Sequence, residues 1–381
     1  MTDRRFALLA GGGTAGHLQP ALAIAEALVA RGHGRDSIEF VGSRRGQDRV
    51  ALEGRGFPVT LLPGRGIARS LRPAVLVQNL GAALGLAEAC VRALDLVRRR
   101  RPQVVVSVGG YASLAASFAA VVLRVPLVLV NVDAVPGAAN RLFGRFAASC
   151  AVGWEDTPLP RAVVTGTPVR PEIAAVARDP DARRVARVEL GLPPDRPVVV
   201  VFGGSLGARR LNDAVAGLGQ RWSGRTDRSI YHIVGRRDWE AAGTPAAGGD
   251  GAAVVRVPYE DRMAVAYTAA DVVVCRAGAM TVAELSMAGV PAVLVPLPGA
   301  PGDHQTANAR VLERAGAAVL LPDAECTGDR LATILDGLLD DPTSLTARGR
   351  AARAVGHPDA AEAGARVVEA STRRPPVRVA P

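Results

Sequence analysis

The stretches FALLAGGGTAGHLQPALAIAEAL (residues 6–28) and VVVVFGGSLGARRLNDAVAGL (198–218) decide the fold class of this chain. Each reads as a buried strand, a glycine-rich turn and a helix, the unit that opens a Rossmann-like domain. In the first stretch the apolar residues from Leu18 to Val29 recur at helical spacing and Gly32 follows as a stop, so we expect a helix that starts just after His17. Two such units in one chain predict two similar lobes.

Short β-branched runs alternate with helical patterns along the rest of the chain, which indicates parallel sheets with helices on both faces. A chain of 381 residues also suits two domains better than one. We therefore predict an α/β protein with two doubly wound, Rossmann-like domains and a cleft between them. The expected strands span residues 6–10, 38–41, 104–108, 127–130, 198–202, 230–234, 254–257, 272–275 and 292–295.

The domain boundary is expected in the segment from Thr157 to Arg196, which is rich in proline, arginine and aspartate and reads as a linker. We assign residues 1–165 to an N-terminal domain and residues 166–372 to a C-terminal domain. Residues 373–381 are expected to form a disordered tail.

The composition excludes several classes of protein. The chain has no lysine, so all 46 of its basic Lys and Arg residues are arginine, and neither a Walker-type phosphate loop nor a pyridoxal enzyme can be built. The four cysteines show neither disulfide-framework nor zinc-site spacing, which favours a reduced, cytoplasmic setting. No apolar stretch reaches the roughly 20 residues of a membrane span. The net charge of +10 reflects either a coding bias or an anionic partner, but sparse aromatics (4%) argue against nucleic acid.

The turn from Gly11 to Gly16 satisfies the dinucleotide fingerprint G-x-G-x-x-G. An NAD-dependent dehydrogenase would also need an acid at the end of the second strand. Glu39 lies inside that strand, so the dehydrogenase hypothesis weakens.

Two further glycine turns, at 203–209 and 109–111, also follow strands and open helices, where free N–H groups favour phosphate. Either turn could instead be purely structural. Glu284 stands near the start of a later helix, where a carboxylate can accept hydrogen bonds from a ribose diol, although an isolated helix glutamate is more often solvated or a cap partner.

Seven motifs in order and at matching spacing resemble the peptidoglycan-precursor N-acetylglucosaminyltransferases of glycosyltransferase family 28. The resemblance covers about residues 6 to 320, and the motifs are GGGTAGHLQPALA, VGGYAS, VPGAANR, GTPVR, FGGSLGARRLN, DRMAVAYTAADVVVCRAGAMTVAEL and DHQTANA.

This resemblance implies a GT-B fold, with a lipid-acceptor lobe followed by a UDP-GlcNAc lobe. The implied enzyme is a UDP-GlcNAc-dependent hexosyltransferase. It moves GlcNAc to the 4-hydroxyl of MurNAc in undecaprenyl-diphospho-MurNAc-pentapeptide (lipid I) and gives lipid II with inversion at the anomeric carbon. The family uses neither a metal in the site nor a cofactor. The D-x-D at 179–181 accordingly reads as a turn.

The resemblance also assigns site residues. In the donor site Glu284 would hold the ribose, Arg170 would contact the nucleotide, and uracil would rest on backbone near Glu260. The implied donor-binding residues are Thr14, Ala15, Gly16, Asp133, Arg170, Ser205, Glu260, Ala279, Met280, Thr281, Glu284, Gln305 and Asn308. The acceptor diphosphate would be held at Gly13, Gly16, Gly109, Gly110 and Tyr111.

Inversion requires a base, and His17 at a helix N-terminus is the candidate, because a histidine pKa of about 6.5 suits proton acceptance near neutral pH. The alternative is that His17 only positions the acceptor. Asp133 replaces an amide, Leu206 a glutamine and Ala15 a glycine of the family pattern. These changes keep open a related transferase that glycosylates another lipid or a specialised metabolite. A non-catalytic nucleotide-sugar binding protein is a third hypothesis.

The segment at 64–77 mixes apolar residues with Arg65, Arg69 and Arg72 and matches the place where the family approaches anionic lipid. We therefore expect a cytoplasmic protein that is peripheral on the inner face of the cell membrane. A plain surface loop is the alternative for this segment.

Overall fold

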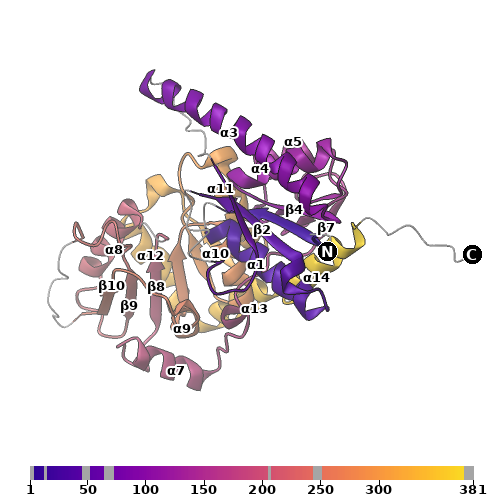
Figure 1. Cartoon of the computed structure of the whole chain (residues 1–381). Coiled ribbons are helices and arrows are strands. Elements are labelled where there is room, and N and C mark those ends of the chain that lie inside the picture. The colour runs from indigo at the N-terminus through magenta and orange to yellow at the C-terminus, as the bar shows by residue number, and fades with distance from the viewer. Residues whose placement is uncertain are drawn as a thin grey trace, which may run out of the picture. The chain divides into compact units, whose positions relative to one another are not determined.

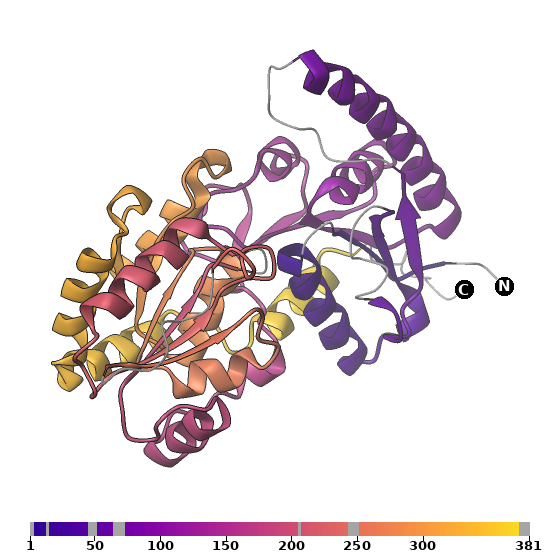
Figure 2. The ribbon, with the colours of Figure 1, turned by 90° about the vertical axis from the view of Figure 1, so that its left-hand side faces the viewer.

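The computed structural model describes residues 4–12, 15–44, 52–63, 73–204, 207–242 and 251–372, with the backbone alone for residues 15 and 73–83. The described chain divides into two compact units. The first contains the residues up to Pro168 together with those from Asp359 onward, and the second is Val169–Pro358. Each unit is a parallel sheet with helices on both faces (Figures 1 and 2).

In its described part the first unit holds seven parallel strands in the order β3-β2-β1-β4-β5-β6-β7. Continuous apolar runs form its central strands because both faces of the sheet are covered. The order reverses between β1 and β4, which creates the switch point where such sheets bind ligands. The strands are β1 (Ala7–Gly11), β2 (Ile38–Ser43), β3 (Val59–Leu62), β4 (Val104–Gly109), β5 (Leu127–Asn131), β6 (Ser149–Val152) and β7 (Ala162–Val164).

Helices of the first unit pack closely because their buried faces are rich in alanine. In α4 the residues Ala112, Ala115, Ala116 and Ala119 are almost fully buried in the core that this helix shares with α3 and the sheet. Helix α14 packs along α1 and contacts β6. The bounds are α1 (Ala15–Ala30), α3 (Pro73–Arg100), α4 (Tyr111–Val122), α5 (Ala138–Gly144), α14 (Ala360–Ala370) and the short turn η1 (Arg35–Ser37).

The second unit repeats the design with six described strands in the order β10-β9-β8-β11-β12-β13, so its switch point lies between β8 and β11. They are β8 (Val198–Phe202), β9 (Ser229–Ile233), β10 (Ala253–Val257), β11 (Val272–Cys275), β12 (Ala292–Leu294) and β13 (Ala318–Leu320). Strand residues such as Val199 and Val274 form a core with α8 and α12. The helices are α6 (Pro171–Ala174), α7 (Pro180–Glu189), α8 (Arg209–Arg221), α9 (Met263–Ala269), α10 (Ala279–Ala288), α11 (His304–Arg314), α12 (Gly328–Leu339) and α13 (Pro342–Ala354), with the turns η2 (Pro301–Asp303) and η3 (Asp323–Glu325).

The predicted α/β fold class and all nine expected strands are confirmed, with small shifts at their ends. The boundary between the units lies at Pro168–Val169, inside the segment from Thr157 to Arg196 where it was expected. The segment is not a plain linker, however, because it forms the edge strand β7 and the helices α6 and α7. The predicted second domain also extends too far, because residues 359–372 belong to the first unit through the packing of α14 on α1. The predicted tail at 373–381 lies outside the described residues.

Two smaller features of the helices also bear on the sequence. Helix α1 begins at Ala15 instead of after His17, a difference within the usual variation of helix ends. Of the four arginines at 98–101, three form the last turn of α3, where cations complement the helix dipole.

Among the described helices, none has the combined length and apolar character that a membrane crossing requires.

Candidate functional site

The carboxyl ends of β1 and β4 lie side by side in the first unit, with Gly11 paired to Gly109. Helices α1 and α4 begin directly after these strands. Gly12, Gly109 and Gly110 have φ angles of 148°, 116° and 85°, a region that favours glycine. A Cβ on Gly110 would lie 2.3 Å from the carbonyl oxygen of Gly12. The two turns therefore approach each other too closely for any side chain at this position.

His17 lies in the first turn of α1, and its ring lies over the second glycine turn. A Cβ built on Gly109 would be 2.7 Å from Cδ2 and 2.9 Å from Nε2 of that ring. The fold thus brings the candidate base and the predicted acceptor-diphosphate turn together. Gly16 lies one residue before His17 in the helix. Gly13 and Thr14 lie outside the described residues, as does the side chain of Ala15.

Ser113, which sequence reasoning missed, connects the two turns from beneath. Its fully buried hydroxyl donates to the Ala10 carbonyl at 2.5 Å and accepts the Gly109 N–H at 3.0 Å. Tyr111, in contrast, packs its side chain against the core, and its buried hydroxyl has no hydrogen-bond partner among the described residues. Burial raises the pKa of that hydroxyl. Tyr111 therefore presents its backbone at the start of α4.

Asp133 lies in the loop that follows β5, partly exposed. The buried Asn131 donates to the carbonyl of Asp133 at 2.6 Å and accepts from Asn140 at 2.9 Å. Trp154 donates to the Val132 carbonyl at 3.1 Å. These bonds fix the loop, so Asp133 is held at the carboxyl edge of the same sheet as the glycine turns.

In the second unit the turn after β8 is equally crowded. A Cβ on Gly203 would lie 2.6 Å from the nitrogen of Ala208, and one on Gly207 would lie 2.5 Å from the carbonyl oxygen of Val234. Gly204 and Gly207 have φ angles of 99° and 87°. Ser205 and Leu206 lie outside the described residues.

A buried network that the sequence did not reveal supports this turn. His232 Nε2 lies 2.9 Å from Asn212 Oδ1, and Asn212 donates to the Val234 carbonyl at 3.1 Å. Burial, assisted by Arg256, lowers the pKa of His232 to about 4. His232 is therefore neutral at pH 7 and can donate to Asn212 without adding charge beneath the turn.

Arg170 and Glu284 lie far apart in the sequence but meet in the second unit. Arg170 Nη2 lies 3.5 Å from Glu284 Oε1, and the Tyr267 hydroxyl donates to Glu284 Oε2 at 2.9 Å. Burial raises the pKa of Glu284, against the opposing effects of Arg170 and Tyr267. A mostly buried carboxylate with one long ion pair retains acceptor capacity for hydroxyl groups.

Glu260 follows β10 and has a carboxylate that is already occupied. It accepts from the Tyr231 hydroxyl at 2.5 Å and from the Arg262 N–H at 2.8 Å. Burial acts to raise its pKa, but the bonds from Arg262 and Tyr231 outweigh burial, so the pKa is lowered. The side chain thus shapes the 259–262 loop and leaves the backbone as the surface offered there.

The N-terminus of α10 carries Ala279, Met280 and Thr281, and its N-cap, Gly278, supplies no side-chain hydrogen bond. Free N–H groups at such an end favour an anion. Gln305 Oε1 accepts from the Leu297 N–H at 2.9 Å, while the fully buried Asn308 donates to the Ala277 carbonyl at 3.2 Å. Both amides therefore anchor the loops beside this helix end.

No group of three or more His, Cys, Asp or Glu side chains that could hold a metal occurs among the residues described by the structure.

Comparison with known proteins matches both units. The model of the glycosyltransferase family 28 N-terminal domain matches residues 7–152, and that of the family's C-terminal domain matches residues 198–363. Two UDP-N-acetylglucosamine--N-acetylmuramyl-(pentapeptide) pyrophosphoryl-undecaprenol N-acetylglucosamine transferases are close in sequence. That of Desulforudis audaxviator is 37% identical over 95% of this chain and 97% of its own length. That of Nocardioides sp. is 42% identical over 95% of this chain and 96% of its own length. The crystal structure of Acinetobacter baumannii MurG has a TM-score of 0.77 at 28% identity, covering 96% of this chain and 99% of its own.

Proposed function

The chain belongs to glycosyltransferase family 28 and has its GT-B fold, and from this premise we propose that it transfers N-acetylglucosamine from UDP-N-acetylglucosamine to N-acetylmuramyl-(pentapeptide) pyrophosphoryl-undecaprenol. The observation that carries the proposal is identity of 37% and 42% to transferases of that name over 95% of the chain. The glycine fingerprint at 11–16 thus belongs to a glycosyltransferase and not to a dehydrogenase.

The donor is proposed to bind the second unit at the carboxyl edge of its sheet. The free N–H groups of α10 and the glycine turn before α8 suit a diphosphate, and their dipoles would stabilise the leaving UDP. Glu284 is mostly buried and bonded to Arg170 and Tyr267, and its carboxylate would accept hydrogen bonds from the ribose hydroxyls. Ser205, Gln305 and Asn308 remain proposed donor-site residues.

His17 is proposed to act as the base in the first unit. Its ring lies against Gly109, in the turn proposed to hold the acceptor diphosphate. As the acceptor 4-hydroxyl attacks the anomeric carbon, the bond from that carbon to the UDP oxygen breaks and the hydroxyl proton passes to the imidazole. The donor's α-linkage becomes β, and UDP leaves as an anion.

The test is transfer of radiolabelled GlcNAc from UDP-GlcNAc to a short-chain analogue of lipid I, in EDTA and without added metal, since we also propose that the reaction needs none. Labelled lipid II confirms the reaction and the acceptor together. Binding of UDP without transfer would refute this acceptor and leave the related transferase of another lipid or metabolite as the candidate.

The role of His17 is tested by His17→Ala, with His33→Ala, three residues beyond the end of α1, as its control. Loss of a general base costs typically 10²- to 10⁴-fold in rate, whereas UDP binding to the second unit should persist. A rate for His17→Ala that equals the control would exclude the base role. A fall of only a few fold, with a raised KM for the acceptor, would assign His17 to positioning.

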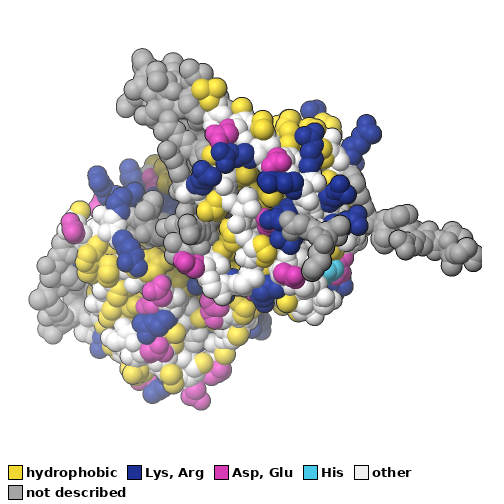
Figure 3. All heavy atoms as spheres, viewed as in Figure 1, with side chains coloured by type: hydrophobic (Ala, Val, Ile, Leu, Met, Phe, Trp, Pro, Cys, Tyr) yellow, Lys and Arg dark blue, Asp and Glu magenta, His cyan; other side chains and the backbone are white. Residues whose placement is uncertain are grey.

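We further propose that the enzyme works as a peripheral protein on an anionic membrane surface through about residues 64–77, of which 64–72 lie outside the described residues. On the adjoining α3, Leu84 and Val91 are exposed, and arginine side chains gather on this face of the first unit (Figure 3). Replacing Arg65, Arg69 and Arg72 by glutamine should weaken binding to anionic liposomes, while Arg184→Gln in the second unit should not. Equal binding of the two variants would refute the assignment.

A further inference from the structure

A cavity of about 480 Å³ lies at the amino edge of the sheet in the second unit. Asp271 directly precedes β11 and Pro291 directly precedes β12, whereas the proposed donor turns follow β8 and β11. Because the strands are parallel, the cavity and the donor turns lie at opposite edges of one sheet, separated by roughly the 13 Å length of a four-residue strand.

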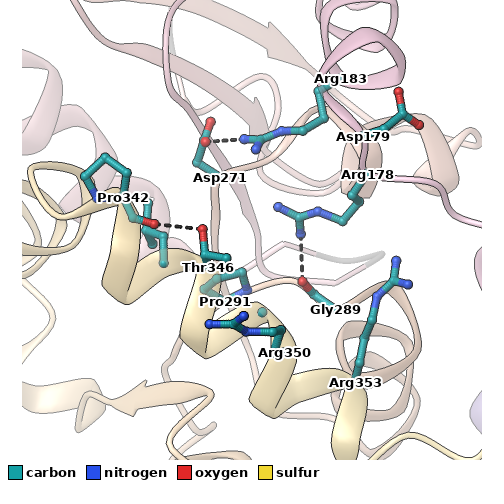
Figure 4. A pocket seen from close by; sticks show the side chains of 12 residues that line it. Arg178, Asp179, Arg183, Asp271, Gly289, Pro291, Pro342, Thr346, Arg350 and Arg353 are labelled. Carbon is teal, nitrogen blue, oxygen red and sulfur yellow. Dashed lines mark hydrogen bonds and ion pairs between the residues drawn. The ribbon is translucent and has the colours of Figure 1, made fainter.

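Arginine dominates the walls of the cavity. Arg178 and Arg183 enter from the α6–α7 segment, and Arg350 and Arg353 enter from α13, so guanidinium groups converge from two sides (Figure 4). Four cations face two carboxylates, those of Asp179 and Asp271.

Both carboxylates are already engaged. Asp271 is ion-paired with Arg183 and with Arg187, the latter at 2.9 Å, and it accepts the Val198 N–H at 2.7 Å. Asp179 accepts the Ala182 N–H at 2.9 Å as the N-cap of α7. The cavity therefore keeps a cationic surplus that its own acids do not neutralise.

The arginines retain donors for a ligand. An arginine carries five N–H donors. Arg178 uses two of them, on the carbonyls of Ala270 at 2.7 Å and Gly289 at 3.1 Å. The side chain of Arg350 makes no hydrogen bond or ion pair with any residue that the structure describes.

Repulsion among the arginines of the cavity also favours a bound anion. Burial lowers the pKa of Arg178 to about 10, and Arg183 and Arg353 act in the same direction. The group stays charged at pH 7, so a bound anion would relieve repulsion among neighbouring guanidinium groups.

We propose that this cavity binds a small soluble polyanion that bears a phosphate or diphosphate group. Arginine presents N–H pairs that match phosphate oxygens bidentately, and the volume lies in the range of small-molecule sites. None of the twelve described residues that line it is aromatic, so recognition rests on phosphate and not on base stacking. The half-buried position of Arg178 favours a small ligand over the flat surface of a protein.

The test is calorimetric titration of the full chain with inorganic pyrophosphate, in saturating UDP so that the donor site is filled. The variants are Arg350→Gln, which removes a cavity arginine without breaking an internal bond, and Arg348→Gln on the same helix but outside the cavity. We expect the wild type and Arg348→Gln to bind pyrophosphate alike, and Arg350→Gln to bind at least tenfold more weakly. Binding should also weaken as salt is added.

Two results would overturn the proposal: no pyrophosphate binding by a UDP-saturated wild type that holds only one equivalent of UDP, or equal affinities of Arg350→Gln and Arg348→Gln. If UDP itself occupies the cavity, the wild type binds two equivalents and Arg350→Gln binds one, which supports the site. Since this readout is binding at the opposite sheet edge, it is independent of whether the transfer assay succeeds.

Discussion

Replacing Gly109 by alanine should disable transfer by displacing His17 while leaving the donor site intact. The new Cβ would lie 2.7 Å from the nearest ring carbon, so the ring must retreat by about 0.8 Å to restore a separation of roughly 3.5 Å. A misplacement of about 1 Å at a reacting group can lower turnover by about 100-fold. The φ of 116° adds a backbone cost of about 1–3 kcal/mol.

The control is Gly32→Ala in the same unit, because Gly32 has a φ of 99° but no atom within 4 Å of the position that a new Cβ would take. It carries the backbone cost without touching His17. The assay measures kcat of GlcNAc transfer, UDP affinity and the thermal midpoint of both variants. We expect both variants to lose a similar amount of thermal stability, and only Gly109→Ala to show a lower kcat of transfer. Equal kcat in the two variants would refute the placement of His17 over this turn as a requirement for catalysis.

Three other predictions concern hydrogen bonds and charge. Ser113→Ala should destabilise the protein by about 1–3 kcal/mol in chemical denaturation, because the part-buried Gly109 N–H loses its acceptor. Ser117→Ala, which removes an equally buried hydroxyl, should cost less, and the reverse order would contradict this prediction. Asp271→Ala should cost about 3–5 kcal/mol by the same measurement because it strands two arginines, whereas Asp195→Ala, in an exposed pair, should cost at most about 1 kcal/mol. Burial raises the pKa of Glu284 in the folded state, so the protonated side chain stabilises the fold below the unfolded pKa of 4.5, and this stabilisation is lost as pH rises through the folded-state pKa. The wild type should therefore lose stability relative to Glu284→Gln over that pH range. A difference in thermal midpoint that does not change with pH would exclude the raised pKa.

The sequence predicted the elements whose residues are apolar on both faces. Val198–Phe202 and Val272–Cys275 occur with the bounds expected, because a strand buried on both sides leaves a continuous apolar run. The edge strand β7 was absorbed into the supposed linker, since all three of its residues are exposed. Its pairing with β6 is a tertiary effect that local sequence does not encode.

The docking of α14 shows a second limit. Its amphipathic pattern is visible in the sequence, but its partner is helix α1, more than three hundred residues earlier in the chain. Arg31 pairs there with Glu362 and with Glu369, the latter at 2.7 Å. Such a contact joins the two ends of the chain, so local periodicity cannot show to which unit this helix belongs.

For the site, motif spacing found the residues that lie at strand ends but not those that support them from below. His17 and Gly109 stand at predicted turns, and the fold places them in contact. Ser113 and His232 lie inside a helix and a strand, where a single polar residue has no distinctive pattern. Their roles depend on hydrogen bonds to the Ala10 carbonyl and to the Asn212 side chain, partners distant in sequence that only the folded chain reveals.

The two edges of the second sheet attract anions by different means, because helices run back between them. At the carboxyl edge α8 and α10 present N-termini, whose N–H groups are electropositive without any charged side chain. At the amino edge the same helices present their C-termini, which carry partial negative charge. An anion site at that edge therefore needs enough arginine side chains to outweigh the charge of the helix ends. Arg178 donates a hydrogen bond to the carbonyl of Gly289 at the end of α10. The side chain of Arg350 bonds to no carbonyl or carboxylate of the described chain. The affinity of the cavity for phosphate should therefore depend on Arg350 more than its exposed position suggests.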